Sequence, residues 1–325
     1  MPSSGPRTCY DRPMNERAHN PPIEPPASNL ERLWTPWRMQ YVGNGPAEEG
    51  CVFCNRLAAT DDVDSLILYR AAHAFLIMNL FPYNTGHLMI VPNQHAASPE
   101  ELDDETQVEM THLLPPVLRA IKRALNPGGF NLGMNLGWVA GAGIAAHMHQ
   151  HVVPRWNGDA NFMPILSNTK VLPELIPASY AKIRAELDRD LYGATEIIAV
   201  AFDPEARTVL VRALPNASAA RLPRFPLTAD ASASSTIAED LGKQGVNGYV
   251  AGWAGARSAG KSSSPALLYL IQPGTQPPAG WRFVTADAPR SSLTPDDADL
   301  LATALDHLKF DKADAESMSV HPHGL

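Results

Sequence analysis

The chain has 325 residues, and its 26 basic against 34 acidic side chains give a formal net charge of −8 at pH 7. Hydrophobic residues make up 45% and charged residues 18%, a composition that fits a globular protein and argues against disorder or a coiled coil. No apolar run is long enough to span a membrane, and no basic cluster favours nucleic acid. We therefore expect neither a membrane nor a nucleic acid as a partner.

The cysteines and the start of the chain bear on the compartment. Three cysteines are too few for a disulfide-stapled secreted scaffold, although two of them lie close enough together for a metal site. The proline-rich start also lacks the apolar stretch of a secretory signal. We expect a cytoplasmic location.

The composition divides the chain into three parts. Seven prolines among the first 28 residues predict a disordered tail over residues 1–29. Large aromatic side chains after Leu30 indicate that ordered sequence begins there, and the pattern changes beyond about Tyr192. Two folded units are therefore predicted, one over residues 30–190 and one over residues 191–325.

Strand and helix signals alternate in the first unit. Apolar runs at 65–69 and 74–78 predict a hairpin, and a third run at 87–91 predicts another strand. Two further strands are expected at 130–136 and 147–154, joined by a loop of small residues.

A long helix is predicted between these strands. Ser98 can cap its first turn, Pro99 suits the first helical position, and Glu101 completes a capping box. Apolar residues then recur at helical spacing as far as residue 125, which indicates one buried face. We expect the pair Pro115-Pro116 to kink or divide this helix.

The second unit has the pattern of an α/β structure without a recognisable catalytic group. Strands are expected at 196–201, 208–214, 249–253 and 266–271, and helices at 235–241 and 295–308. Residues 255–262 satisfy the pattern of a phosphate-binding loop, but Pro265 falls where the helix of that motif should continue. We interpret them as a Gly/Ser-rich loop between two strands. The unit could regulate, extend a dimer interface or cover an active site.

Three histidines at 147–151 carry the strongest functional signal. His147, His149 and His151 alternate with other residues, and alternation in a strand places all three imidazoles on one side. Each imidazole can act near neutral pH as a nucleophile, a proton carrier or a metal ligand. A solvated strand face is the plain alternative, which the apolar pair Val152-Val153 makes less attractive.

At these residues the sequence resembles the histidine-triad (HIT) superfamily, whose signature is His-φ-His-φ-His-φ-φ with φ apolar. Gln150 departs from it at one φ position. The tract Leu33-Trp-Thr-Pro36, the pair Cys51 and Cys54, and residues 151–156 resemble the bacterial branch related to fragile histidine triad proteins and diadenosine tetraphosphate phosphorylases. The resemblance implies an α+β fold with an antiparallel sheet and helices, protomers that often pair as a homodimer, and a nucleoside phosphate bound beside the triad. The α/β extension after it is of unknown type.

The resemblance also assigns catalytic roles. His149 matches the family nucleophile, which attacks the α-phosphorus of a nucleoside polyphosphate and forms a nucleotidyl-histidine intermediate. His151 would orient the site and donate hydrogen bonds to phosphate oxygens, and His147 completes the triad. Transferase relatives carry Gln at the third position, so His151 favours a hydrolase or a phosphorylase.

Substrate contacts follow from the same resemblance. Asn79 and His87 match the nucleoside-contacting segment, although Asn79 taken alone could equally serve a turn. Asn135 matches an amide that faces the phosphates, and Gly141 matches the glycine turn before the triad. Relatives often continue with Gln and then Ser or Thr, whereas this chain has Ala-Gly-Ile at 142–144. Backbone N–H groups could replace those side chains.

The pair Cys51 and Cys54 is ambiguous by itself, because this spacing serves zinc, redox exchange or plain burial. The resemblance implies a zinc site in which His95 and His147 join the two cysteines. Two thiolates and two imidazoles suit a closed, tetrahedral, structural zinc.

These observations predict an enzyme that cleaves dinucleoside polyphosphates, such as diadenosine tetraphosphate, through His149. Water as acceptor would make it a hydrolase, and phosphate as acceptor would make it a phosphorylase. Two alternatives remain open, a nucleoside phosphoramidase and a nucleotide-binding sensor without strong chemistry.

Overall fold

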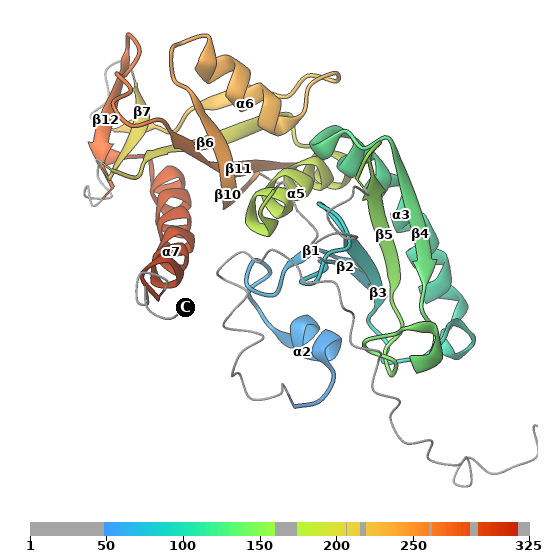
Figure 1. Ribbon diagram of the computed structural model, residues 1–325. Helices are drawn as coiled ribbons and strands as arrows, with labels where there is room; N and C mark the ends of the chain where they lie inside the picture. The colour runs from blue at the N-terminus through green and yellow to red at the C-terminus, as the bar shows by residue number, and fades with distance from the viewer. Residues whose placement is uncertain are drawn as a thin grey trace, which may run out of the picture.

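Two β-sheets and the helices around them make up the structure (Figure 1). The computed structural model describes residues 49–159, 174–205, 207–214, 219–259, 262–286 and 292–317. The predicted tail at 1–29 and the predicted start of order after Leu30 lie outside the described residues. None of the described helices is long and apolar enough to cross a membrane.

The first sheet has five strands in the order β1-β2-β3-β5-β4, and every neighbouring pair is antiparallel. Its strands are β1 (Ile67–Arg70), β2 (Ala74–Met78), β3 (Leu88–Pro92), β4 (Gly129–Met134) and β5 (Gln150–Arg155). The predicted hairpin and the three further strands are therefore present. The expected α+β class with an antiparallel sheet and helices is confirmed.

Alternating side chains of this sheet pack against a helix on each face. Leu76 and Ile90 belong to the core cluster that includes α3 (Asp104–Leu125), whereas Phe75 and Ile77 pack with Phe53 of α2 (Val52–Ala58). The second face therefore carries the short helix that begins directly after Cys51.

The start of α3 differs from the prediction. Ser98 precedes only a three-residue turn, η3 (Pro99–Glu101), and makes no side-chain cap bond. The helix begins at Asp104, and the carboxylate of Asp103 accepts a hydrogen bond of 2.7 Å from the N–H of Thr106. Asp103 is followed by two further acidic residues, which interact favourably with the positive end of the helix dipole. The predicted capping box is wrong because a second, better-supported cap follows it.

Pro115 and Pro116 do not divide α3, which continues through both of them to Leu125. Each proline removes the hydrogen bond to the carbonyl four residues earlier. Those earlier residues, Thr111 and His112, are exposed, so water can satisfy the freed carbonyls. The helix then ends after Leu125, where the helical spacing of apolar residues also stops, and Asn126 adopts the left-handed conformation that is common at helix ends.

The second sheet is mixed, with the order β10-β11-β6-β7-β12 and a parallel pairing between β11 and β6. Its strands are β6 (Glu196–Asp203), β7 (Thr208–Ala213), β8 (Ala220–Arg221), β9 (Arg224–Pro226), β10 (Gly248–Ala259), β11 (Ser262–Ile271) and β12 (Trp281–Thr285). Helices α5 (Ile176–Tyr192) and α6 (Ala233–Gly242) contribute to the core on one face, and α7 (Pro295–Ser317) to the core on the other. Strands β10 and β11 form an antiparallel hairpin. Residues 255–259 and 262 of the false phosphate-binding motif belong to these strands and not to the expected loop, because they pair with the facing strand of the hairpin.

Helix α5 lies between the two sheets (Figure 1) and packs against both. One continuous core runs from Leu76 of the first sheet through Ala181 and Ile183 of α5 to Leu267 of the second. The guanidinium of Arg123 on α3 also pairs with Glu186 of α5 at 2.7 Å. The predicted boundary between residues 190 and 191 therefore falls near the end of a helix that serves both units, and the division into two domains stays a prediction.

Candidate functional site

The triad lies where the chain enters β5. His151 is within the strand and faces Met89 and Gly133 in the register of its neighbours. The strand begins at Gln150, so His147 and His149 precede it, in contrast to the predicted strand at 147–154. All three side chains are buried, and the rings of His149 and His151 stand nearly perpendicular with centroids 4.8 Å apart.

The hydrogen bond of His149 fixes which nitrogen is free to react. Its Nδ1 lies 3.0 Å from the carbonyl oxygen of His147. Because a carbonyl only accepts, the proton of the neutral ring sits on Nδ1, and Nε2 keeps its lone pair. Burial lowers the pKa of His149, which keeps the ring neutral at pH 7. The side chain is thus set up as a nucleophile at Nε2.

A second chain of hydrogen bonds orients His151. The N–H of Tyr83 donates to Nδ1 of His87 at 3.0 Å, so the proton of His87 lies on Nε2. That Nε2–H donates to Nδ1 of His151, also at 3.0 Å, which leaves the proton of His151 on its own Nε2. Burial, with the neighbouring His149, lowers the pKa of His151 to about 4. His151 is therefore a neutral, oriented hydrogen-bond donor near pH 7.

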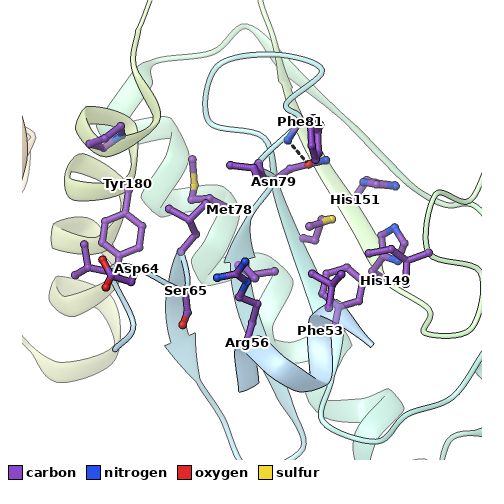
Figure 2. Close-up of a pocket in the computed structure, with 18 of the residues that line it drawn as sticks. Phe53, Arg56, Asp64, Ser65, Met78, Asn79, Phe81, His149, His151 and Tyr180 are labelled. Carbon is purple, nitrogen blue, oxygen red and sulfur yellow. Dashed lines mark hydrogen bonds between the residues drawn. The ribbon is translucent and has the colours of Figure 1, made fainter. Parts of the chain in front are cut away.

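A cavity of about 1010 Å³ opens beside these rings (Figure 2). Five of the residues predicted to act on substrate line it: Asn79, Asn135, Gly141, His149 and His151. His87 is fully buried behind His151 and is not part of the lining, so its contact is with the triad. His147 points instead towards the two cysteines.

Asn79 stabilises a turn and also lines the cavity. Its Oδ1 accepts a hydrogen bond of 2.8 Å from the N–H of Phe81, drawn as a dashed line in Figure 2, which stabilises the turn after β2. Its Nδ2 lies 3.2 Å from Nδ1 of His87. The same side chain lines the cavity, so a turn role and a place at the site coexist.

The loop before the triad offers few groups for phosphate. Gly141 adopts the left-handed conformation with φ of 85°, which a side chain would strain. The N–H groups of Gly141 and Ala142 donate back to Trp138 and Gly137, so they do not face the cavity. Gly143 and Ile144 line it, and within the described residues no hydrogen bond engages their N–H groups.

Four side chains form a compact cluster next to the triad. The ligand atoms of Cys51, Cys54, His95 and His147 all lie within 4.8 Å of one another. Nδ1 of His147 is 3.3 Å from Sγ of Cys51 and 3.6 Å from Sγ of Cys54. Zinc distances of about 2.3 Å to sulfur and 2.0 Å to nitrogen imply tetrahedral S–N edges of about 3.5 Å, so the donor set fits zinc.

His147 connects this cluster to His149. Its Nε2–H donates to the carbonyl of Pro92 at 2.9 Å, which leaves the Nδ1 lone pair directed at the sulfurs. Its own carbonyl accepts from Nδ1 of His149. One residue therefore faces the cysteine cluster with its side chain and orients the ring of His149 with its backbone.

Sequence reasoning missed several residues of the site. Phe53 packs between His147 and His149, with ring centroids 5.4 and 5.0 Å away. Its position between the two cysteines was the available signal. Tyr83, whose ring centroid is 5.6 Å from that of His151, lies in the segment already assigned to the nucleoside. No motif pointed to Trp253, which lines the cavity from the second sheet.

The fold and this site define a histidine-triad protein, and comparison with known proteins agrees. A sequence profile of the family described as "HIT domain" matches residues 60–158. The chain is 36% identical to "AP-4-A phosphorylase" of Mycobacterium tuberculosis (strain H37Rv) over 176 residues, which are 52% of this chain and 85% of that protein. The chain therefore belongs to the HIT family, in the branch similar to AP-4-A phosphorylase.

More distant relatives share the same region. "Adenosine 5'-monophosphoramidase hnt1" of Schizosaccharomyces pombe is 25% identical, over 42% of this chain and 98% of that protein. A solved structure described as a "ZN-bound histidine triad family protein from Mycobacterium smegmatis" is 28% identical, covers 43% of this chain and 94% of that chain, and has a TM-score of 0.35. Named relatives of the chain are thus enzymes. The family profile ends at residue 158 and does not cover the second sheet.

Proposed function

We propose that this protein is a nucleotidyl hydrolase or phosphorylase that cleaves dinucleoside polyphosphates through His149. The observation that carries the proposal is the state of this ring, whose Nδ1–H is held by the carbonyl of His147 while Nε2 keeps its lone pair beside a large cavity. The similarity to AP-4-A phosphorylase supports the substrate class.

The first step is an in-line displacement at the α-phosphorus. Nε2 of His149 attacks, an N–P bond forms, and the P–O bond to the rest of the polyphosphate breaks, so the leaving phosphate takes the electron pair. The ring then carries a positive charge, which its Nδ1–H shares with the carbonyl of His147. In the second step water or inorganic phosphate attacks the same phosphorus and the N–P bond breaks, which regenerates neutral His149.

His151 stabilises the phosphate during both steps. Its Nε2–H donates to a non-bridging oxygen, because Nδ1 is already occupied by His87. The low pKa of His151 means that it acts as a neutral donor and not as a general acid near pH 7. Asn135 and the N–H groups of Gly143 and Ile144 supply the remaining polar contacts at this end of the cavity.

Cys51, Cys54, His95 and His147 would hold a structural zinc ion. The metal would cross-link α2, the end of β3 and the approach to β5. Four protein ligands would complete its coordination and leave no open position for catalysis. Thiolate ligands also need a reducing compartment, which supports a cytoplasmic location.

We also propose that two copies pair along β4. This strand is the edge of the first sheet, so one of its sides has no partner strand among the described residues. Large apolar side chains are exposed on it and directly after it, among them Leu132, Met134 and Trp138 at 45%, 40% and 66% exposure. A second copy of the same strand would cover both the unpaired edge and this apolar surface.

Turnover of a substrate panel tests the proposal. Wild type should cleave diadenosine polyphosphates, and inorganic phosphate should convert one product into a diphosphate only if the enzyme is a phosphorylase. Faster turnover of an adenosine phosphoramidate would favour the phosphoramidase, to which the similarity with hnt1 points. Nucleotide binding without any turnover would favour the sensor.

A further inference from the structure

The cavity beside the triad extends to the second sheet. Ala251, Gly252 and Trp253 of β10 and Leu268 of β11 line it, together with Tyr180 of α5. In Figure 2, Tyr180 lies on the opposite side of the cavity from His149 and His151. Part of the wall thus comes from residues that the HIT profile does not cover.

The size of the cavity leaves room beyond the reacting phosphate. Its volume of about 1010 Å³ lies at the upper end of the range of roughly 300 to 1,000 Å³ for small-molecule sites. Towards the end remote from the triad the lining includes Met78 and Tyr180, with Asp64 and Ser65 on the same side (Figure 2). Trp253 belongs to this end as well, because Arg184 lies over its ring and donates to the same carbonyl as Tyr180. Such a wall suits a flat heteroaromatic ring better than a phosphate.

This remote wall is held in place from both sheets. The guanidinium of Arg184 lies over the ring of Trp253, 5.6 Å from its centroid. Arg184 also donates to the carbonyl of Ile67 in β1 at 3.3 Å, and the hydroxyl of Tyr180 donates to the same carbonyl at 2.8 Å. The two aromatic side chains are therefore fixed relative to the first sheet before any ligand binds.

A polar group faces the same end. Ser65 lines the cavity and is only 3% exposed. Its backbone N–H donates to Asp61, but within the described residues its hydroxyl makes no hydrogen bond. The hydroxyl is not enclosed by protein atoms, so it is available to a polar edge of a ligand in the cavity.

We propose that the second unit takes part in substrate recognition by closing the nucleobase end of the cavity. Trp253 forms the aromatic wall against which the base packs, and the hydroxyl of Ser65 meets its polar edge, while the triad reacts with the phosphate at the other end. Trp253 is then a specificity-determining residue. This inference rests on the proposed function and extends it to the second sheet.

A substitution that fills the cavity provides the sharpest test. Gly252 lines the cavity, and a Cβ added to it would meet only Cδ2 of Leu268 within 4 Å, at 3.9 Å, so a larger side chain has room there and narrows the cavity beside Leu268. Gly252→Leu should raise the KM for diadenosine tetraphosphate and the Kd for AMP about tenfold, which corresponds to about 1.4 kcal/mol. The kcat should stay within about twofold because the triad is untouched.

Two further variants complete the design. Trp253→Ala should also weaken AMP binding. If Trp253→Ala does not fold, Trp253→Phe replaces it, and this variant should keep only part of the wild-type affinity for AMP. Tyr249→Ala is the matched control, because Tyr249 lies on the same strand but is 64% exposed and does not line the cavity. Its KM and Kd should equal those of wild type, and thermal unfolding shows that each variant is folded.

The outcomes separate the two proposals. Weaker binding in Gly252→Leu and in the folded Trp253 variants, with Tyr249→Ala unchanged, supports the role of the second unit. Wild-type KM and Kd in a folded Gly252→Leu overturn that role and leave the proposed activity intact. Wild-type protein that neither binds nor cleaves nucleotides contradicts the proposed function itself.

Discussion

Buried titratable groups behave differently beside the two sheets. Beside the first, His149 and His151 are buried at a cavity, have no acidic partner among the described residues, and have their pKa values lowered by burial. Beside the second, the fully buried Asp297 of α7 meets the guanidinium of Arg224 at 2.5 Å and the N–H of Leu222 at 3.2 Å. A buried polar group therefore indicates a candidate site only where it lies beside a cavity and where ion pairs or hydrogen bonds within the protein do not already explain its burial.

Helix α5, which lies between the two sheets, also carries a buried carboxylate that is paired within the protein. Glu186 is fully buried, and its carboxylate accepts from Arg123 at 2.7 Å and from the N–H of Ala233, the first residue of α6, at 2.7 Å. Such a group contributes to the position of helices and not to chemistry. The predictions below test this contrast between reactive and structural buried groups.

The largest effect is expected at the nucleophile. His149→Ala should lower kcat by about 10⁴-fold or more, because it removes the nucleophile of the proposed reaction. The Kd for AMP should change by no more than a few fold, which equilibrium titration checks. Appreciable turnover by a zinc-loaded, folded His149→Ala would contradict the assignment.

The proposed zinc site should contribute to the free energy of unfolding. Cys51→Ser combined with Cys54→Ser should abolish zinc binding and lower the free energy of unfolding by roughly 4 kcal/mol or more, since metal binding is coupled to folding. Elemental analysis and chemical denaturation measure the two quantities. Cys9→Ser, at the third cysteine of the chain, is the control and should keep both at the wild-type level. Zinc-free wild type with full stability would contradict the assignment.

His151 should make stability depend on pH. Its pKa of about 4 in the folded protein lies below the ordinary value of 6.5, so between these values the unfolded chain binds the extra proton. The free energy of unfolding should therefore fall as the pH drops from 7 to 4.5, by about 2 to 3 kcal/mol from this residue. Chemical denaturation at both pH values should show a smaller drop for His151→Gln, and equal drops would exclude this origin.

The smallest effect is expected at the ion pair between Asp297 of α7 and Arg224 of β9. Asp297→Asn should lower the free energy of unfolding by about 2 kcal/mol, because it removes a charge-assisted hydrogen bond to Arg224. Activity at a temperature where the variant is folded should be unchanged. Asp296→Asn is the matched control, since Asp296 is half exposed in its pair with Arg257 and should contribute little. A selective loss of kcat in Asp297→Asn would place this group in the chemistry.

Sequence patterns predicted the features that depend on residues close together in the chain. The hairpin of β1 and β2, the strand β3 and the end of α3 at Asn126 follow from alternation, helical spacing and turn chemistry. The start of α3 was missed because Ser98 and Asp103 are both good caps, and only packing decides which is used.

The part of the candidate site that the histidine motif and the cysteine pair contain could be predicted from the sequence. The four cluster residues and both cavity histidines lie together as the resemblance implied. The position of His87 behind His151 depends on the pairing of β3 with β5, and the contribution of Trp253 depends on how α5 joins the two sheets. No local pattern encodes either contact. Tertiary contacts of this kind need the structure.

Covalent chemistry at His149 is the central claim, and trapping it is the most direct test. Diadenosine tetraphosphate is mixed with enzyme, quenched within milliseconds under alkaline denaturing conditions, and the digested protein is analysed by mass spectrometry. The account predicts an adenosine monophosphate adduct on His149 that forms during turnover, is lost in acid, and is absent from His149→Ala. An adduct on any other residue, or turnover with no adduct at any quench time, would contradict it.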